Sequence, residues 1–374
     1  MTNINQTGFL SLTLLTASLA LHGMAQSTLT EFDAPRAAIV SSPACAPSCG
    51  TIALANNTSG LIVGYYTDTY IVPHGFVRTP DGHMISFDAP GAGLGAGLDQ
   101  GTVAYSVNEL GVIAGQFEDA NDVFHGFVRL PEGYFSAFDA PGAGTGAYQG
   151  TLAFSINPEG ATAGIYIDGN SVVHGFVRSH DGGISSFDPS GSVYTYPCEE
   201  TCLSQDGAIT GFYLDANNTF HGFLRDPDGT IREFDAPGGG TGNYLGTVAA
   251  SINPDGTITG YVEDSNAVAH GFARARDGSF TTFDVPGAGT GPGQGTLAFS
   301  ISSLGAIAGE FLDANNAMHG FARSARGILV PFDAPDAGTG AGQGTRPSTN
   351  NGKAAVAGWY VDTNSLNHGF VWNP

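Results

Sequence analysis

Seven histidines recur along the chain at a spacing that raises the question of metal binding. Each belongs to a His-Gly-Phe tripeptide, and successive copies are 51, 49, 47, 49, 49 and 49 residues apart. These histidines are His74, His125, His174, His221, His270, His319 and His368. Histidine is a common metal ligand, but one copy on the same strand of every repeat is more typical of a structural polar contact. We therefore interpret the seven as structural residues and expect no metal ion or other cofactor.

A second recurring pattern, Asp-x-Asn, could supply oxygen ligands for calcium. It occurs at Asp168/Asn170, Asp215/Asn217, Asp264/Asn266, Asp313/Asn315 and Asp362/Asn364. Each copy falls between two short apolar runs, where Asp and Asn favour turns. A calcium loop requires more oxygen ligands than the two that each turn offers. We interpret the pattern as a turn and keep calcium binding as the alternative.

Four cysteines form two Cys-x3-Cys pairs, Cys45/Cys49 and Cys198/Cys202. In an exported chain an even number of cysteines favours disulfide bonds, and each pair can close a small ring. A zinc site is the alternative, but two cysteines per loop without an adjacent histidine fall short of four ligands. The sequence therefore predicts the disulfide bonds Cys45–Cys49 and Cys198–Cys202.

The segments that carry these cysteines, residues 36–51 and 189–202, differ from the corresponding segments of the other repeats. The second of them combines aromatic and acidic side chains. Aromatic faces stack on sugar rings, and carboxylates accept hydrogen bonds from hydroxyl groups. The alternative is that the disulfides only stiffen two irregular loops. The binding residues predicted on an acidic rim are Tyr194, Tyr196, Glu199 and Glu200.

A glycine-rich stretch, FDAPGAGTG, resembles the loops that surround nucleotide phosphates. Its PGAGTG part or a near variant begins at Pro90, Pro141, Pro237, Pro286 and Pro335. A phosphate loop requires a following helix whose N-terminal N–H groups point at the ligand. Each copy here precedes a strand pattern instead. We therefore interpret the stretch as a linker whose glycines allow a tight crossing from one unit to the next.

The elements that must position these residues follow from the repeat. The unit is approximately FDAPGAGTGxxQGTxxxSINxxGxIxGxYxDxNxxxHGFxRxxDGxxTT, and turn signals divide it into four short strands. In the third full unit the expected strands are residues 150–157, 161–168, 172–179 and 183–188. Seven such units predict an all-β fold, a seven-bladed β-propeller with four antiparallel strands per blade. A parallel β-helix is the alternative.

The two ends of the repeat array predict a closed ring. The last unit stops after its third strand, and residues 28–33 have the sequence of the missing fourth strand. A linear array gives no reason for this shift, whereas in a ring the N-terminal strand completes the last blade and removes open edges. We expect residues 28–33 to pair with residues 367–372.

The turn between the third and fourth strands sets which side chains face each other. A two-residue turn such as Asp81-Gly82 would place Phe76 opposite Phe87, and the other units would follow with the same separation of 11. In that register the histidine of His-Gly-Phe and the aspartate of Phe-Asp point to opposite faces of one blade. The two would then meet only between neighbouring blades.

Composition limits the partners and the compartment. The formal net charge is −22 with a single lysine, Lys353, which disfavours nucleic acids and anionic membrane surfaces. Residues 1–25 hold no charged side chain and contain an apolar run from Phe9 to Leu21 that is too short to span a bilayer. We predict a signal peptide over residues 1–25 and one domain over residues 26–374. The mature chain is expected to be a secreted, extracellular or periplasmic monomer without a membrane span.

The HGFxR, FDAPGAGTG and SINxxG motifs resemble the extracellular HAF-repeat proteins of bacteria. The resemblance covers residues 27–374, with His-Gly-Phe in place of His-Ala-Phe. It implies an exported, propeller-like protein and carries no established activity.

The repeat also limits the chemistry. Every histidine belongs to the repeat or stands alone, as His22, His83 and His180 do, so no catalytic Ser-His-Asp or Cys-His set can be singled out. We expect a binding or structural module for neutral glycans or a protein partner at the cell surface. The alternative is a carbohydrate-active hydrolase or lyase that uses carboxylates on the rim.

Overall fold

The computed structural model describes residues 27–38, 49–95, 100–197 and 201–374, which form β-strands and no helix. Within these ranges no segment meets the length and apolarity that a membrane-crossing helix needs. The predicted signal peptide lies outside the described residues. The strands are β1 (Thr28–Phe32), β2 (Gly50–Asn56), β3 (Ile62–Thr67), β4 (Pro73–Arg78), β5 (Met84–Phe87), β6 (Thr102–Val107), β7 (Ile113–Glu118), β8 (Phe124–Arg129), β9 (Phe135–Phe138), β10 (Gly150–Ile156), β11 (Thr162–Ile167), β12 (Val173–Arg178), β13 (Ile184–Phe187), β14 (Tyr194–Pro197), β15 (Ile209–Leu214), β16 (Phe220–Arg225), β17 (Ile231–Phe234), β18 (Gly246–Ile252), β19 (Ile258–Glu263), β20 (Ala269–Arg274), β21 (Phe280–Phe283), β22 (Gly295–Ile301), β23 (Ile307–Leu312), β24 (Met318–Arg323), β25 (Leu329–Phe332), β26 (Gly344–Asn350), β27 (Val356–Val361) and β28 (Asn367–Asn373).

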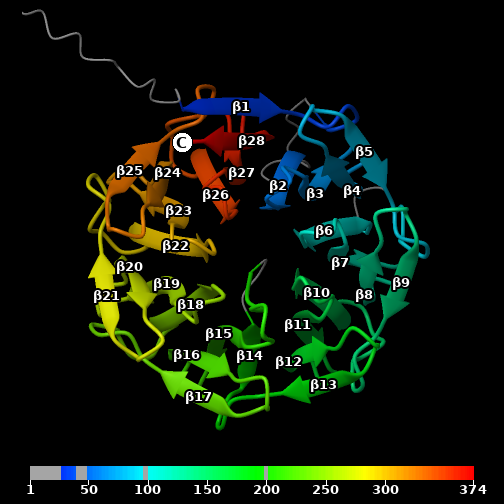
Figure 1. Cartoon of the computed structure of the whole chain (residues 1–374), viewed down its shortest axis with the longest axis horizontal. Helices are drawn as coiled ribbons and strands as arrows, with labels where there is room; N and C mark the ends of the chain where they lie inside the picture. Colours follow the sequence, from blue (N-terminus) through cyan, green and yellow to red (C-terminus); the bar gives the residue numbers. More distant parts are fainter. Residues whose placement is uncertain (1–26, 39–48, 96–99, 198–200) are drawn as a thin grey trace, which may run out of the picture.

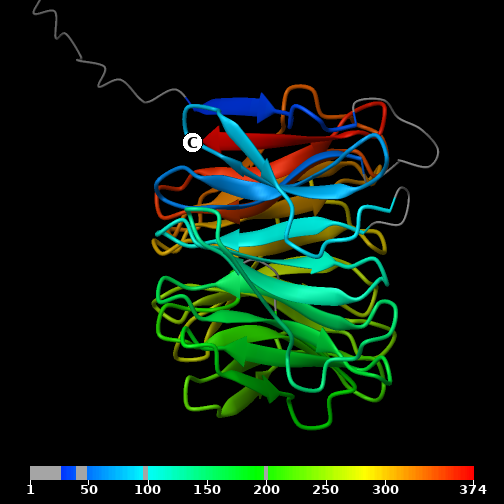
Figure 2. The same ribbon diagram turned by 90° about the vertical axis from the view of Figure 1, so that its right-hand side faces the viewer.

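Antiparallel pairing joins these strands in groups of four, which we call units. In chain order they are β2–β5, β6–β9, β10–β13, β14–β17, β18–β21, β22–β25, and β26–β28 with β1. Figure 1 shows the units around a ring, with the first strand of each unit toward the centre and the fourth at the periphery. In the side view the loops gather on two opposite faces (Figure 2). The all-β prediction with repeated four-stranded units is confirmed.

Strand positions follow the turn signals closely. The four strands expected in the third full unit correspond to β10, β11, β12 and β13, each within one residue of the expected start and of the expected end. These strands begin and end where Gly, Asn, Asp and Pro interrupt the alternation of apolar side chains.

The predicted pairing of the third and fourth strands is wrong by one residue. Phe87 pairs with Gly75, and Phe76 pairs with Ser86, so the two phenylalanines do not face each other. The same shift occurs in the corresponding hairpins of the other units.

The physical reason is the length of the turn. The Thr79 N–H donates to the His83 carbonyl (2.8 Å), and the Gly82 N–H donates to the Thr79 carbonyl (2.9 Å), so three residues separate the hairpin ends. Gly82 has φ +92°, a left-handed conformation that glycine adopts without steric cost. The additional turn residue moves every cross-strand partner by one position.

The shift moves the aromatic contacts from within units to between them. The Phe87 ring lies over Gly75, where an added Cβ would be 2.6 Å from the ring. It meets the fully buried Phe127 of the next unit edge to face, with centroids 6.4 Å apart. Equivalent contacts are Phe32–Phe76, Phe138–Phe176, Phe187–Phe223, Phe283–Phe321 and Phe332–Phe370. A stack of phenylalanines between units is therefore a main part of the core.

The arginine of the His-Gly-Phe-x-Arg motif adds a second contact between units. Arg78 lies over the ring of Phe32, with its guanidinium carbon 4.6 Å from the ring centroid, and Arg129 lies over Phe87 at the same distance. Arg178, Arg225, Arg274 and Arg323 lie in the same way over Phe138, Phe187, Phe234 and Phe283. Each arginine thus lies on a phenylalanine of the preceding unit.

The first strand of the chain pairs with the last. β1 runs antiparallel to β28, with Thr28 opposite Asn373 and Phe32 opposite Gly369. The predicted pairing of residues 28–33 with the last unit is confirmed. Segments at opposite ends of the sequence thus complete one four-stranded unit (Figure 1).

Candidate functional site

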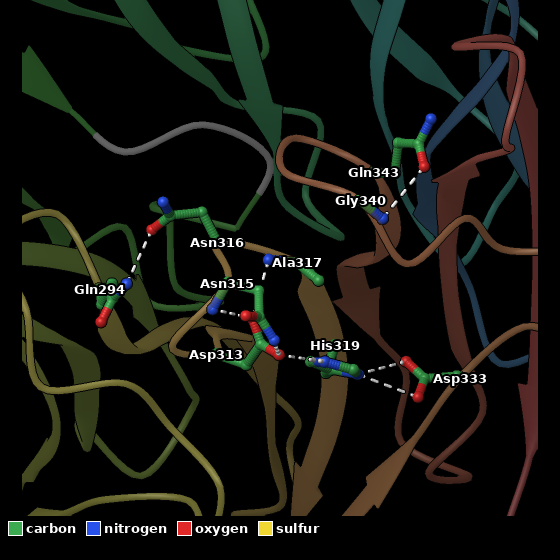
Figure 3. Close-up of polar contacts among 9 residues, drawn as sticks. All are labelled: Gln294, Asp313, Asn315, Asn316, Ala317, His319, Asp333, Gly340 and Gln343. Carbon is green, nitrogen blue, oxygen red and sulfur yellow. Dashed lines mark hydrogen bonds and ion pairs between the residues drawn. The ribbon is translucent and has the colours of Figure 1, made fainter.

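Each unit places one histidine between two aspartates, and the unit containing His319 shows the arrangement (Figure 3). His319 Nδ1 lies 3.0 and 3.1 Å from the two carboxylate oxygens of Asp333, and Nε2 lies 3.9 Å from Asp313 Oδ2. Asp313 Oδ1 accepts the backbone N–H groups of Asn315 (2.8 Å) and Ala317 (2.9 Å). We call such a set an Asp–His–Asp cluster.

The clusters correct the predicted orientation of these side chains. In all seven units the histidine Nδ1 and the aspartate of Phe-Asp lie 2.7 to 3.1 Å apart on neighbouring strands of one unit. They do not meet between units, because the three-residue turn brings both side chains to the same face. This contact is consistent with a structural role for the histidines.

Hydrogen bonds shift the pKa of two of these histidines and of aspartates at the turns. The bond to Asp88 raises the pKa of His74 above its ordinary value, and the bond to Asp33 raises the pKa of His368. At the Asp-x-Asn turns the backbone N–H of Val172 lowers the pKa of Asp168. Both oxygens of these aspartates bond within the turn, as in Asp168 with Asn170 and Val172. Among the described residues no group of three or more ligating side chains is placed to hold a metal ion.

The glycine-rich linkers surround an amide group of their own chain. Between β21 and β22, Gln294 Oε1 accepts the Gly291 N–H (2.9 Å). Gln294 Nε2 donates to Asn316 Oδ1 (2.9 Å) (Figure 3). A Cβ at Gly289 would lie 2.3 Å from the same Oε1. Gln343 and Gly340 repeat the first contact at 3.1 Å. The linker glycines therefore make room for the glutamine side chain.

The inner strands enclose a central cavity of about 520 Å³. Half of its lining residues are aromatic and come from strands of different units; the others are aliphatic residues, Ser348 and one arginine, Arg346. The aromatic lining residues are Tyr65, Tyr105, Tyr194, Tyr196, Phe212, Tyr261, Phe299 and Trp359. A concave, mainly apolar site with few polar groups is the usual form of a small-ligand site.

Part of this lining comes from a position that differs among otherwise similar units. The second strand of every unit contains a glycine followed by this position: the residues are Tyr65, Gln116, Ile165, Phe212, Tyr261, Glu310 and Trp359. Because strand side chains alternate between faces, the residues beside this position point elsewhere. This variation is a sequence signal for the cavity, because a position with a purely structural role would keep one residue type in every unit.

The structure places Tyr194 and Tyr196 in this cavity and not on the predicted rim. Both lie on β14, which takes the innermost place in its unit although its sequence lacks the usual first-strand motif. Their rings are parallel to within 2°, with centroids 5.9 Å apart. Tyr196 also packs against Phe154 and Phe212, at 5.3 and 5.2 Å. Glu199 and Glu200 lie outside the described residues.

One ion pair lies in the cavity wall. Arg346 Nε donates to Glu310 Oε2 (2.9 Å) and Nη2 to Oε1 (3.4 Å), and the guanidinium carbon lies 4.7 Å from the Trp359 ring centroid. The Glu310 side chain is 4% exposed and that of Arg346 is 37% exposed. Burial raises the pKa of Glu310, and the charge of Arg346 opposes this effect.

The cysteine pairs are described only at one member each. Cys49 is buried and disulfide-bonded, whereas Cys202 is buried with a free thiol. Cys45 and Cys198 lie outside the described residues. The Cys45–Cys49 pairing therefore stays a prediction. The predicted Cys198–Cys202 bond is not supported, because the Cys202 thiol is free.

Comparisons with known proteins identify the fold. No family model and no curated protein match the chain. A streptogramin B lyase structure is similar with a TM-score of 0.57 at 16% identity, over 92% of this chain and 97% of that one. The BP39L lectin from Burkholderia pseudomallei also has a TM-score of 0.57, at 10% identity, over 87% and 98%. Puromycin hydrolase has 0.52 at 14%, over 86% of this chain and 52% of its own. The first two are β-propellers, and the likeness confirms the propeller-like fold.

Proposed function

We propose that this chain is an exported, closed, seven-bladed β-propeller that binds a neutral glycan in its central cavity. The blade count is supported by the seven four-stranded units, and closure is supported by the pairing of β1 with β28. Export is supported by the uncharged, apolar character of residues 1–25.

The aromatic lining of the central cavity carries this proposal. Flat aromatic faces exclude water from the C–H faces of sugar rings while sugar hydroxyls stay hydrogen-bonded at the edges. Tyr194 and Tyr196 present two parallel rings to the cavity, and Trp359 lies in its wall on another blade. Aromatic side chains at inward positions that differ among the units are not required by the repeat itself.

The charge of the protein supports a neutral ligand. A net charge of −22 repels anionic sugars at long range. The charged side chain that lines the cavity, Arg346, is paired with Glu310, so the two charges cancel there. The similarity to the BP39L lectin shows a shared fold and is compatible with this function.

A glycan array tests the proposal. We expect the wild-type protein to bind neutral glycans and the Tyr194→Ala/Tyr196→Ala variant to bind them about tenfold more weakly, since each aromatic contact contributes about 0.5–1.5 kcal/mol. Tyr134→Ala, which removes a tyrosine that is 73% exposed and outside this cavity, is the matched control. Equal binding by all three proteins, or no binding by the wild type, would contradict the proposal.

A carbohydrate-active hydrolase or lyase is the second candidate, and one observation favours it. Glu310 lies behind Arg346 in the cavity wall, and burial raises its pKa, which is the direction that a carboxyl acting as a general acid needs, while the charge of Arg346 opposes this effect. The repeated aspartates of the Asp–His–Asp clusters are engaged with histidines and turns, and the rim carboxylates Glu199 and Glu200 lie outside the described residues. Release of reducing ends or unsaturated products from the bound polysaccharide would assign the chain to this class.

A further inference from the structure

The two charged residues of the cavity wall stand where the sibling units have none. Arg346 follows Gly-Thr in the first strand of its unit, where the other units that carry this motif have Ile52, Val103, Leu152, Val248 and Leu297. Glu310 stands where the other units have an aromatic residue, Gln116 or Ile165. The siblings form the same strand pairs with these neutral residues, so the fold requires neither charge.

An ion pair with a buried carboxylate gives little stability in return. Removing two charges from water costs about as much as their attraction returns, and apolar replacements are often neutral or stabilising. Glu310 is 4% exposed, and its carboxylate bonds to Arg346 across two units, from β23 to β26. The sibling units form the same strands without such a pair. Its presence here therefore indicates a role other than folding.

The geometry leaves part of the arginine available to a ligand. Arg346 donates from Nε and Nη2 to Glu310, and the Trp359 ring packs against one face of the guanidinium. Arg346 itself lines the cavity. Among the described residues no acceptor is bonded to Nη1. The guanidinium is thus fixed in position by its two neighbours while keeping N–H donors unused.

We propose that Arg346, positioned by Glu310, is the polar anchor of the central cavity and donates from Nη1 to a hydroxyl oxygen of a neutral sugar ring. This inference rests on the proposed glycan function and adds its specificity. Glu310 makes the anchor neutral overall, so a sugar hydroxyl is accepted, whereas the carboxylate of a uronic acid meets the negative charge of Glu310 a few ångströms away.

Matched neutral and acidic sugars test this role. The probes are the methyl glucoside, galactoside and mannoside with their three uronic acid counterparts, titrated against the full chain by calorimetry and by fluorescence of Trp359. The other tryptophan, Trp372, is buried in the core. We expect the wild type to prefer the neutral members. Arg346→Leu should lower neutral-sugar affinity at least tenfold, and Glu310→Gln should shift the preference at least tenfold toward the uronic acids.

Controls separate recognition from folding. Leucine and glutamine are the residues of sibling units at these positions, so Glu310→Gln/Arg346→Leu should melt no lower than the wild type. Arg346→Lys keeps the charge but loses the planar set of guanidinium N–H donors and should also weaken neutral-sugar binding.

An unchanged neutral-to-acidic preference in Glu310→Gln, or full binding by Arg346→Leu, overturns the proposed role of Arg346 as the anchor. If Tyr194→Ala/Tyr196→Ala loses binding at the same time, the glycan function stands without it. A wild type that binds no neutral probe overturns the anchor, and no binding on the array overturns the function as well.

Discussion

At the scale of single residues, the repeated histidines connect two parts of a unit. His368, for example, reaches Asp33 through Nδ1 and faces Asp362 through Nε2 at 3.7 Å. The sequence predicted a structural role for these histidines from their regular recurrence. It did not predict the partner, because the partner depends on one additional turn residue that the Asp-Gly signal does not reveal.

The cluster that contains His368 predicts how stability depends on pH. The pKa of His368 is raised in the folded chain, so its contribution is fully present below the unfolded value of about 6.5 and is lost as pH rises through the folded-state value. We expect the melting temperature to fall from pH 6 to pH 8, and to fall less in His368→Gln. Thermal melts in constant ionic strength measure this difference.

The matched variant for this experiment is His83→Gln, because His83 is exposed and lies outside the clusters. It should keep the slope of the wild type, which includes the growing repulsion within an acidic protein. Identical slopes for His368→Gln and the wild type would show that the cluster does not couple protonation to folding.

At the scale of elements, strand positions were predictable and their contacts were not. The turn residues fix where each strand ends, and β10 to β13 lie where the pattern placed them. Which face of a strand points to the cavity depends on the assembled ring, so period-two alternation alone could not place Tyr194 or Trp359. The charged residues at inward positions, Glu310 and Arg346, were visible in the sequence only as departures from the repeat.

The linkers give the element-scale prediction. Gly289→Ala should destabilise the protein by about 1–3 kcal/mol, because the new Cβ would meet Gln294 Oε1 at 2.3 Å and the Asp313 backbone at 2.9 Å. Gly169→Ala is the control, since a Cβ there meets nothing within 4 Å and three sibling units carry alanine at that position. Urea unfolding of both variants measures the cost, and equal midpoints would contradict the proposed role of the linker glycines.

At the scale of the whole molecule, the unit that joins the two chain ends has the same register as its siblings. Leu29 lies opposite Trp372 as Met84 lies opposite Arg78. Asn373 and Thr28 therefore occupy the places of Thr79 and His83, and Pro374 that of Pro80. An Asp-Gly insertion between Pro374 and Thr28 would reproduce the Pro80-Asp81-Gly82 turn of the β4–β5 hairpin.

This equivalence predicts a functional circular permutant. A chain that runs from Ala34 to Pro374, then Asp-Gly, then Thr28 to Asp33 should melt within about 4 °C of the wild type, because it keeps every strand pair. Deleting residues 26–35 without replacement should lower the melting temperature or promote oligomers, because it exposes the edge of β28. Calorimetry and light scattering compare the three chains. An unchanged transition in the deletion would show that β1 does not close the ring.

The alternation of side chains along the inner strands separates recognition from folding. Residues such as Phe311 and Tyr360 pack between blades, while Glu310 and Trp359, their immediate neighbours, are directed toward the cavity or its wall. A substitution at an inward position should therefore change the chemistry of the proposed ligand site without altering the interfaces between units. If the cavity binds a ligand as proposed, its specificity can be changed by substituting the inward residue of one unit at a time, while the rest of the fold stays the same.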